Sequence, residues 1–285
     1  MIRRCLAVLA LLEGLAGCGK APIERVEWPV MGTIAAVQTR GGDGLFDLRR
    51  EVAISAVGVG REMLLEVERS LNAHDPKSEL SQLASLDEAG ILARCDSLMR
   101  PCYEAAFRLM KESDGAFNPR WKGPKTLDLG AIAKGFAVDY AASGMYFDGN
   151  DALLDLGGNL KALRGEGGPH KDWSVGVKNP QGDGFCAVVQ LKTFEALATS
   201  ATYYRGSHIH DGRTGKPVTN GVASVTVLHP KSAMLADGLS TTLFVLGPEK
   251  GKDFVEAHYP ESAVLWIMED GRRIRRDAEN RFELK

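Results

Sequence analysis

The sequence predicts an α+β fold, because strand-like and helix-like segments mingle in it without the regular alternation of a doubly wound sheet. One long amphipathic pattern and several short apolar runs support this class. With 285 residues, 44% of them apolar, the chain can bury a large core as one domain or two closely joined lobes. The net charge is -2 and no basic stripe is interleaved with aromatic residues, so we expect no nucleic-acid partner.

The first half of the chain after residue 27 is predicted as one strand followed by helices. Alternating apolar residues predict a strand over 28–39, and apolar residues spaced four and seven apart predict a long helix over 45–71. The polar stretch 72–76, which ends in proline, breaks that helix, and Ser78 caps a short helix after it. Amphipathic spacing over 92–113, interrupted by a proline, predicts the next helix.

The second half is predicted to be rich in strands. Short apolar or alternating runs predict strands at 152–156, 160–164, 172–178, 186–191, 195–199 and 222–229, with a closing hairpin of 263–269 and 272–276. A helix is expected over 232–246. The stretch 200–217 is polar, contains two histidines and has no periodicity.

Residues 1–18 predict a bacterial export signal, because a short basic region precedes an apolar stretch too short to span a membrane. The ending L-A-G-C resembles a lipoprotein lipobox, in which Cys18 becomes the lipidated first residue of the mature chain. We expect a protein on the periplasmic side of the cell envelope, anchored by lipid to a membrane; a cleaved signal without lipid is the alternative. Residues 19–27 are predicted as a linker and 28–285 as the folded domain.

Export also bears on the remaining cysteines, since exported compartments permit disulfides. Cys95 and Cys102 are the candidate pair, which leaves Cys186 single. Their spacing is not that of a metal site, so we assign them no chemistry.

The stretch Thr126 to Tyr140 is the densest in candidate functional groups. We expect a short strand that ends at Leu129, a turn at Gly130 and a helix from about Ala131. A helix start offers unpaired N–H groups and a positive dipole end, which suit a phosphate, and Lys134 adds a full positive charge there. The alternative is an ordinary strand–helix junction with Lys134 in solvent.

Two side chains of the predicted last helix, Asp237 and Thr241, stand four residues apart and therefore share one face. A carboxylate and a hydroxyl suit a hard cation such as Mg²⁺, which prefers oxygen ligands. The alternative is a hydroxyl bonded to its own helix backbone beside a solvated carboxylate.

Two further motifs have both a functional and a structural interpretation. In S-H-I-H-D-G-R-T-G, His208 or His210 could act as a general base, or Asp211 could simply cap a turn at Thr214. The glycines of G-G-N at 157–159 would let a ligand approach the backbone, or would form a plain tight turn.

Taken in order, the motifs of this chain resemble those of one family, the ApbE family of FAD:protein FMN transferases. They are M-G-T (31–33), P-K-S-E-L-S-Q-L (76–83), G-A-F-N-P (115–119), D-L-G-A-I-A-K-G-F-A-V-D (128–139), L-L-D-L-G-G-N (153–159), A-T-S-A-T-Y-Y-R (198–205), H-I-H-D-G-R-T-G-K-P-V (208–218) and A-D-G-L-S-T (236–241). The resemblance covers nearly the whole chain after the signal.

The resemblance implies a single ApbE-like domain of two lobes, with mixed sheets, packed helices and an FAD cleft between the lobes. It implies a Mg²⁺-dependent reaction in which a Thr or Ser hydroxyl of an acceptor flavoprotein attacks FAD, takes the FMN moiety and releases AMP. Such an acceptor would be a respiratory or redox protein of the membrane or periplasm.

The family's site residues carry over onto this chain by position. The metal ligands would be the backbone carbonyl of Ala131 and the side chains of Asp237 and Thr241, and His208 would activate the acceptor hydroxyl. The residues that would contact FAD are Met31, His74, Ala116, Phe117, Asn118, Asp128, Lys134 and Ile209.

The chain also departs from the family pattern. It has His74 for the usual Tyr, Ala84 for Asn, Asn118 for Asp, Ala201 for Gly, Gly212 for Pro and Gly238 for Ala. The segment between Phe117 and Asp128 is also much shorter than in familiar members, which leaves open how the flavin ring is covered.

Two rival functions fit the same residues. One is a pyrophosphatase, in which water replaces the acceptor hydroxyl and FAD yields FMN and AMP. The other is a non-catalytic lipoprotein that binds FAD to store or deliver it. Asp237, Thr241, Lys134 and His208 together favour catalysis, because storage of a flavin requires no metal at its pyrophosphate.

Overall fold

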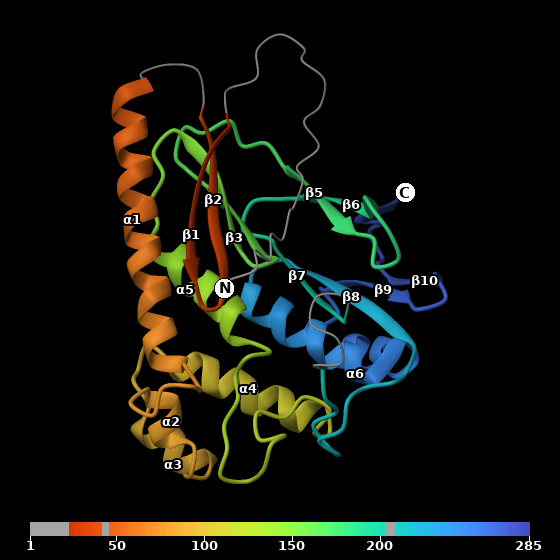
Figure 1. Ribbon diagram of the computed structural model, residues 1–285. Helices are drawn as coiled ribbons and strands as arrows, with labels where there is room; N and C mark the ends of the chain where they lie inside the picture. Colours follow the sequence, from red (N-terminus) through yellow and green to blue (C-terminus); the bar gives the residue numbers. More distant parts are fainter. Residues whose placement is uncertain (1–22, 42–45, 203–208) are drawn as a thin grey trace.

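The computed structural model describes residues 23–41, 46–202 and 209–285 (Figure 1). The strands are β1 (Ile23–Val30), β2 (Thr33–Gly41), β3 (Asn150–Leu156), β4 (Asn159–Arg164), β5 (Trp173–Lys178), β6 (Phe185–Leu191), β7 (Ala196–Ala201), β8 (Val222–His229), β9 (Ala263–Met268), β10 (Arg273–Arg276) and β11 (Phe282–Leu284). The helices are α1 (Phe46–Leu71), α2 (Glu79–Leu83), α3 (Glu88–Arg94), α4 (Arg100–Glu112), α5 (Ala133–Gly144) and α6 (Ala233–His258). None of these helices has the length and apolar character needed to cross a membrane.

The α+β class is confirmed, and the strands form two sheets. The larger has eight strands in the order β1-β2-β3-β4-β7-β8-β9-β10, and the smaller has three in the order β11-β6-β5. Within the described ranges every pairing between these strands is antiparallel, which differs from the expected mixed sheets. Hairpins connect some pairs of neighbouring strands. Other neighbouring strands are connected by long insertions, after which the chain returns to lie beside the preceding strand.

The eight-stranded sheet is covered on both faces. Ala152 and Leu154 of β3 pack in the core formed with the helices, whereas Leu153 between them packs in a second core with residues of the small sheet. Every residue of β3, β8 and β9 is buried for this reason. Figure 1 shows α1 along one side of the molecule and α2, α3 and α4 gathered at one end.

The N-terminal strand prediction needs correction. Residues 28–39 do not form one strand, because Met31 and Gly32 turn the chain with φ of 51° and 67° and split it into the antiparallel pair β1 and β2. Since β1 begins at Ile23, residues 23–27 of the predicted linker are strand. Met31 is not a glycine, and its backbone N–H donates to Glu68 Oε1 of α1 at 2.7 Å, which holds this turn.

The helices agree more closely with the sequence. Ser78 caps α2 by accepting the Ser81 N–H, as predicted. Two helices, α3 and α4, replace the interrupted 92–113 helix, and the first non-helical residue within α6 is Gly247, where the predicted helix ends. Cys95 and Cys102 are buried and free, so the predicted disulfide is wrong.

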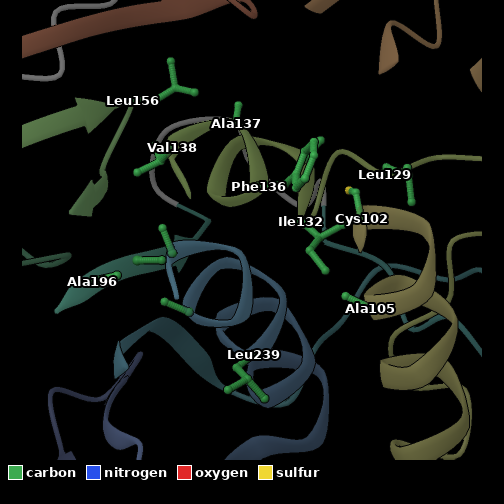
Figure 2. Packing of buried hydrophobic residues seen from close by; sticks show 14 of the residues in the cluster. Cys102, Ala105, Leu129, Ile132, Phe136, Ala137, Val138, Leu156, Ala196 and Leu239 are labelled. Atoms are coloured by element: carbon green, nitrogen blue, oxygen red, sulfur yellow. The ribbon is translucent and has the colours of Figure 1, made fainter. Parts of the chain in front are cut away.

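Helices α5 and α6 approach each other closely at Gly135. A Cβ at this position would lie 2.2 Å from the Ala233 carbonyl oxygen and 2.6 Å from Asp237 Cβ. The hydrogen of glycine is therefore the only side chain that this crossing admits. Just before α5, Ile132 is fully buried, and Figure 2 shows it beside Cys102 and Ala105 of α4.

Asp139 of α5 fixes where α6 begins. Its carboxylate accepts hydrogen bonds from Ser232 Oγ at 2.7 Å and from the N–H groups of Ala233 and Met234 at 2.9 and 3.0 Å. Lys161 of β4 adds an ion pair at 2.6 Å. The carboxylate thus satisfies N–H groups that a helix start leaves unpaired, and its charge suits that end of the helix dipole.

We predict that Gly135→Ala lowers the free energy of unfolding by about 2–3 kcal/mol, because the added methyl group has no room between α5 and α6. Urea unfolding measures this. Gly58→Ala is the matched control, since a Cβ at this exposed α1 position meets nothing within 4 Å and should stabilise by ~0.5–1 kcal/mol. Equal effects of the two substitutions would contradict the close crossing.

Candidate functional site

The centre of the candidate site is the buried carboxylate of Asp237 in α6. Its Oδ2 accepts the N–H of Gly135 at 2.9 Å and lies 4.0 Å from Lys134 Nζ. The two central residues of the sequence prediction, Asp237 and Lys134, are therefore brought together by the α5–α6 crossing. Burial raises the pKa of Asp237, and Lys134 and the Gly135 N–H oppose that rise.

The start of α5 differs in part from the expectation. The residues before it form a turn and not a strand, and α5 begins at Ala133. Leu129 O accepts the N–H of Ala133 at 2.8 Å, and the Gly135 N–H is taken by Asp237. Some of the N–H groups that were expected to be free at the start of α5 are thus hydrogen-bonded within the protein. Lys134 supplies a full positive charge at this start of the helix.

Ala131 lies in the turn before α5, and the next residue of that turn, Ile132, packs against α6 at Gly238. A Cβ on Gly238 would meet Leu109 Cδ1 at 2.5 Å and the neighbouring Ile132 Cδ1 at 3.2 Å. Ala131 is half-buried, and this packing places the turn beside α6. The same contacts give a physical reason for Gly238 at a position where the family resemblance implied Ala, because Leu109 occupies the space of a methyl group.

The hydroxyl of Thr241 lies one helical turn after Asp237 and contacts β7. Ser200 Oγ is 3.0 Å from Thr241 Oγ1 and 2.7 Å from Ser240 Oγ. The hydroxyl of Thr241 is thus engaged across the helix–sheet boundary, as neither sequence interpretation anticipated.

Two glycine turns lie at this same end of the sheet. A Cβ on Gly157 would be 2.5 Å from Thr33 Oγ1, so the β3–β4 turn adjoins the β1–β2 turn at Met31. Leu160 of β4 pairs with Leu197 of the antiparallel strand β7, so the β3–β4 turn before β4 and Ser200 near the end of β7 lie at the same end of the sheet. Gly158 has φ 92° and open space around its Cβ position. G-G-N therefore forms the tight turn that one interpretation gave, and the close approach of a ligand to its backbone stays a prediction.

A second group of predicted residues joins the 115–119 turn to the 209–215 segment. Asn118 Nδ2 donates to the Gly212 carbonyl at 2.9 Å, and the Gly212 N–H donates to the Ala116 carbonyl at 3.1 Å. A Cβ on residue 212 would be 2.4 Å from Asn118 Cβ. The two departures, Asn118 and Gly212, are therefore direct neighbours, and the amide NH₂ makes a bond that an ionised Asp would not donate.

The short segment after Phe117 is held in place by Arg120. Its guanidinium donates to the carbonyls of Ala84, Pro124 and Thr126 at 2.7–3.1 Å, and to that of Leu86. Ala84 is one of the departures from the family pattern, and it contacts Arg120 through its backbone carbonyl. Arg120 therefore holds this short segment as a compact loop through hydrogen bonds to backbone carbonyls.

The same loop brings Asp128 and His210 to one aromatic side chain. Trp121 stacks on His210 with ring centroids 4.2 Å apart, and its Nε1–H donates to Asp128 Oδ2 at 3.3 Å. Lys122 Nζ is 2.8 Å from the same carboxylate oxygen. Burial raises the pKa of Asp128, but the bonds from Lys122, the Gly130 N–H and Trp121 outweigh it, and the net pKa is lowered.

The remaining predicted residues differ in their exposure. Ala116, Phe117 and Ile209 are buried in the core, so only their backbone is suited to line an open site. His74 is exposed after α1. His208 and Cys18 lie outside the described residues.

Sequence reasoning missed Trp121, Arg120, Gly135 and the role of Ser200. The A-T-S run that contains Ser200 directly precedes the polar 200–217 stretch, which was a usable signal. Trp121 and Arg120 lay in a segment noted only for its shortness. The partner of Gly135 is 102 residues away, so no local pattern indicated it.

A hollow of about 370 Å³ lies away from this site and does not correspond to the predicted FAD cleft. It is bordered by Glu195, Pro230, Ser262 and Arg281. Arg281 forms a two-pronged ion pair with Glu195 at 2.7 and 2.8 Å, so these two charges neutralise each other.

Comparison with known proteins identifies the chain at the family level. Residues 120–266, more than half of the chain, match the ApbE family. The chain belongs to the ApbE family. The matched region begins at Arg120 and includes Lys134, Ser200 and Asp237, which are the residues that make up the centre of the site.

Among ApbE-family relatives, the FAD:protein FMN transferase of Vibrio cholerae serotype O1 is 36% identical over 157 residues, which cover 51% of this chain and 46% of the relative. The FAD:protein FMN transferase of Rhodobacter capsulatus is 39% identical over 154 residues, which cover 51% of this chain and 28% of the relative. The chain thus spans about half the length, or less, of these curated relatives.

Solved structures of the family agree over nearly the whole fold. The flavin transferase ApbE from Vibrio cholerae superposes with a TM-score of 0.70 at 25% identity, covering 90% of this chain and 98% of that one. The ApbE protein from Thermotoga maritima gives 0.74 at 22% identity, covering 93% and 100%. At such identity the Thermotoga protein supports the fold alone.

Beneath the Gly157–Gly158 turn, the buried carboxylate of Asp155 should make stability depend on pH. Burial raises its pKa from 3.8 to about 6, against a bond from the Gly158 N–H. The folded protein therefore favours the protonated form, whose stabilising contribution is full below pH 3.8 and is lost as the pH rises to about 6. The shift corresponds to roughly 3 kcal/mol.

We predict that Asp155→Asn removes this loss. Between about pH 3.5 and 7, the unfolding free energy of the wild type should fall by roughly 3 kcal/mol relative to the variant, measured by urea unfolding at each pH. Parallel curves for the two proteins would show that Asp155 keeps an ordinary pKa.

Proposed function

We propose that this protein transfers the FMN moiety of FAD to a Thr or Ser hydroxyl of an acceptor flavoprotein, with Mg²⁺ as the required cation. The acceptor Oγ forms a bond to the phosphorus on the FMN side, and the bond from that phosphorus to the bridging oxygen breaks. AMP leaves with the bridging oxygen, and the hydroxyl proton passes to a base. The products are an FMN phosphoester on the acceptor and free AMP.

The observation that carries this proposal is the position of Asp237. A buried carboxylate lies at the start of α5, 4.0 Å from Lys134, with the Thr241 hydroxyl one turn further along its helix. A buried carboxylate needs positive charge beside it, and Lys134 at this distance supplies only part of it. A cation would complete the balance.

The donor set fits Mg²⁺. Asp237, the Thr241 hydroxyl and the Ala131 carbonyl are hard oxygen donors, and few protein ligands leave positions for phosphate oxygens. When bound, Mg²⁺ would neutralise charge that develops on the pyrophosphate. Lys134 would add a positive charge on the protein side of the same group.

The second group of residues would bind the rest of FAD. The turn of Ala116 and Asn118 is bonded to Gly212, and Trp121 connects Asp128 to His210, so both segments form one preorganised wall. The accessible backbone at Gly158 borders the end of the sheet where Ser200 lies. His208 remains the proposed base, on the sequence evidence given above.

We also propose that the protein is exported and held at a membrane by lipid on Cys18, which would place it with periplasmic acceptors. This rests on the signal-like residues 1–18 and the L-A-G-C ending. Metabolic labelling with a radioactive fatty acid should mark the wild type and not Cys18→Ser; equal labelling of both would refute the anchor.

The direct test is to incubate residues 19–285 with FAD, Mg²⁺ and a candidate acceptor, and to weigh the acceptor by mass spectrometry. The proposal predicts a mass gain of one FMN phosphoester that disappears when the cation is chelated. Free FMN and AMP without a labelled acceptor would indicate a pyrophosphatase. Intact bound FAD would indicate a carrier.

We predict that Asp237→Asn lowers the transfer rate by more than about 100-fold, since it removes a charged cation ligand while its side-chain oxygen can still accept the Gly135 N–H. The control is Asp270→Asn, which removes an exposed carboxylate paired with Arg272 and should leave the rate unchanged. Full activity in Asp237→Asn would exclude the assigned cation site.

A further inference from the structure

Three side-chain hydroxyl groups, those of Ser200, Ser240 and Thr241, lie close together where β7 contacts α6. Ser200 Oγ lies 2.7 Å from Ser240 Oγ and 3.0 Å from Thr241 Oγ1. Ser240 Oγ is also 2.8 Å from the backbone carbonyl oxygen of Asp237. Two of these residues follow Asp237 on the same helix, so the cluster adjoins the candidate cation site.

Counting the protons fixes the direction of each bond. A carbonyl only accepts, so Ser240 must use its single O–H on Asp237 O. Ser240 Oγ therefore accepts from Ser200, which uses the O–H of Ser200. Ser200 Oγ then accepts the O–H of Thr241. The protons run from Thr241 to Ser200 to Ser240 to the backbone.

A hydroxyl that binds a cation must offer a lone pair and direct its proton elsewhere. We propose that Ser200 and Ser240 are positioning residues that hold the Thr241 proton away from the cation and leave its oxygen lone pairs free to coordinate. This rests on the proposed function, because it assumes the cation site at Asp237 and Thr241. Partners in an outer layer commonly orient metal ligands in this way.

The next residue on α6 shows the ordinary alternative. Thr242 Oγ1 donates to Gly238 O at 2.8 Å, a bond back to its own helix. Thr241 instead meets a strand residue brought from 41 positions away. The two neighbouring threonines therefore have different hydroxyl environments, and only the one assigned to the cation has its hydroxyl connected to Ser200 and Ser240.

The experiment titrates Mn²⁺, an EPR-visible substitute for Mg²⁺, into residues 19–285 in the presence of FAD. We expect Ser200→Ala and Ser240→Ala each to weaken Mn²⁺ binding by about 10–100-fold. Ser200→Thr keeps a hydroxyl and should restore most of the affinity. The matched control is Thr199→Val, which removes the neighbouring hydroxyl of β7 that bonds to Thr226 at 2.9 Å, and it should bind as the wild type does.

The double variant distinguishes a connected chain from two separate packing effects. If the three hydroxyls form a connected chain of hydrogen bonds, the double variant Ser200→Ala with Ser240→Ala should lose no more Mn²⁺ affinity than Ser200→Ala alone. If the two substitutions act independently, their losses of affinity should multiply. Urea unfolding of each variant confirms that the compared proteins are folded.

The outcomes separate this inference from the proposed function. Wild-type affinity in Ser200→Ala, with weakened binding in Asp237→Asn, would overturn the hydroxyl chain and leave the cation site standing. Equal Mn²⁺ binding by the wild type and Asp237→Asn would overturn both. Multiplicative losses in the double variant would also refute the chain.

Discussion

The close crossing of α5 and α6 at Gly135 is the constraint on which the candidate site depends. Because a Cβ there would lie 2.2 Å from the Ala233 carbonyl, only glycine allows Asp237 to reach the Gly135 N–H. The same crossing lets Asp139 cap the first turn of α6. One backbone approach thus sets both the beginning of α6 and the place of its buried carboxylate at the start of α5.

Around this crossing, separate layers of the fold contribute to one end of the large sheet. Strand β7 supplies Ser200, whose hydroxyl meets Thr241, and the antiparallel pairing of β4 and β7 puts Ser200 at the same end of the sheet as the Gly157 turn. The loop held by Arg120 brings Trp121 against His210 and Asp128. One end of the large sheet and two hydrogen-bonded loops therefore position groups that are far apart in sequence, which is the preorganisation that the proposed phosphoryl transfer would require.

The sequence predicted most elements because their local patterns are strong, as for the cap at Ser78 and the end of the first α6 segment at Gly247. It failed where long-range contacts decide. A positive φ at Met31 turns an apparent single strand into a hairpin. Family motifs located Asp237, but the role of Gly135 follows from packing against a residue 102 positions away, and no local spacing reveals that.

We propose that the α5–α6 crossing builds a divalent-cation site. Anomalous diffraction from a crystal of residues 19–285 soaked with Mn²⁺ and FAD tests this site most directly. We expect one strong peak within coordination distance of the Asp237 carboxylate, the Thr241 hydroxyl and the Ala131 carbonyl, about 2.0–2.1 Å for the Mg²⁺ that Mn²⁺ replaces. A fully occupied peak elsewhere, with Asp237 still bonded to Gly135 and no cation beside it, would refute the site.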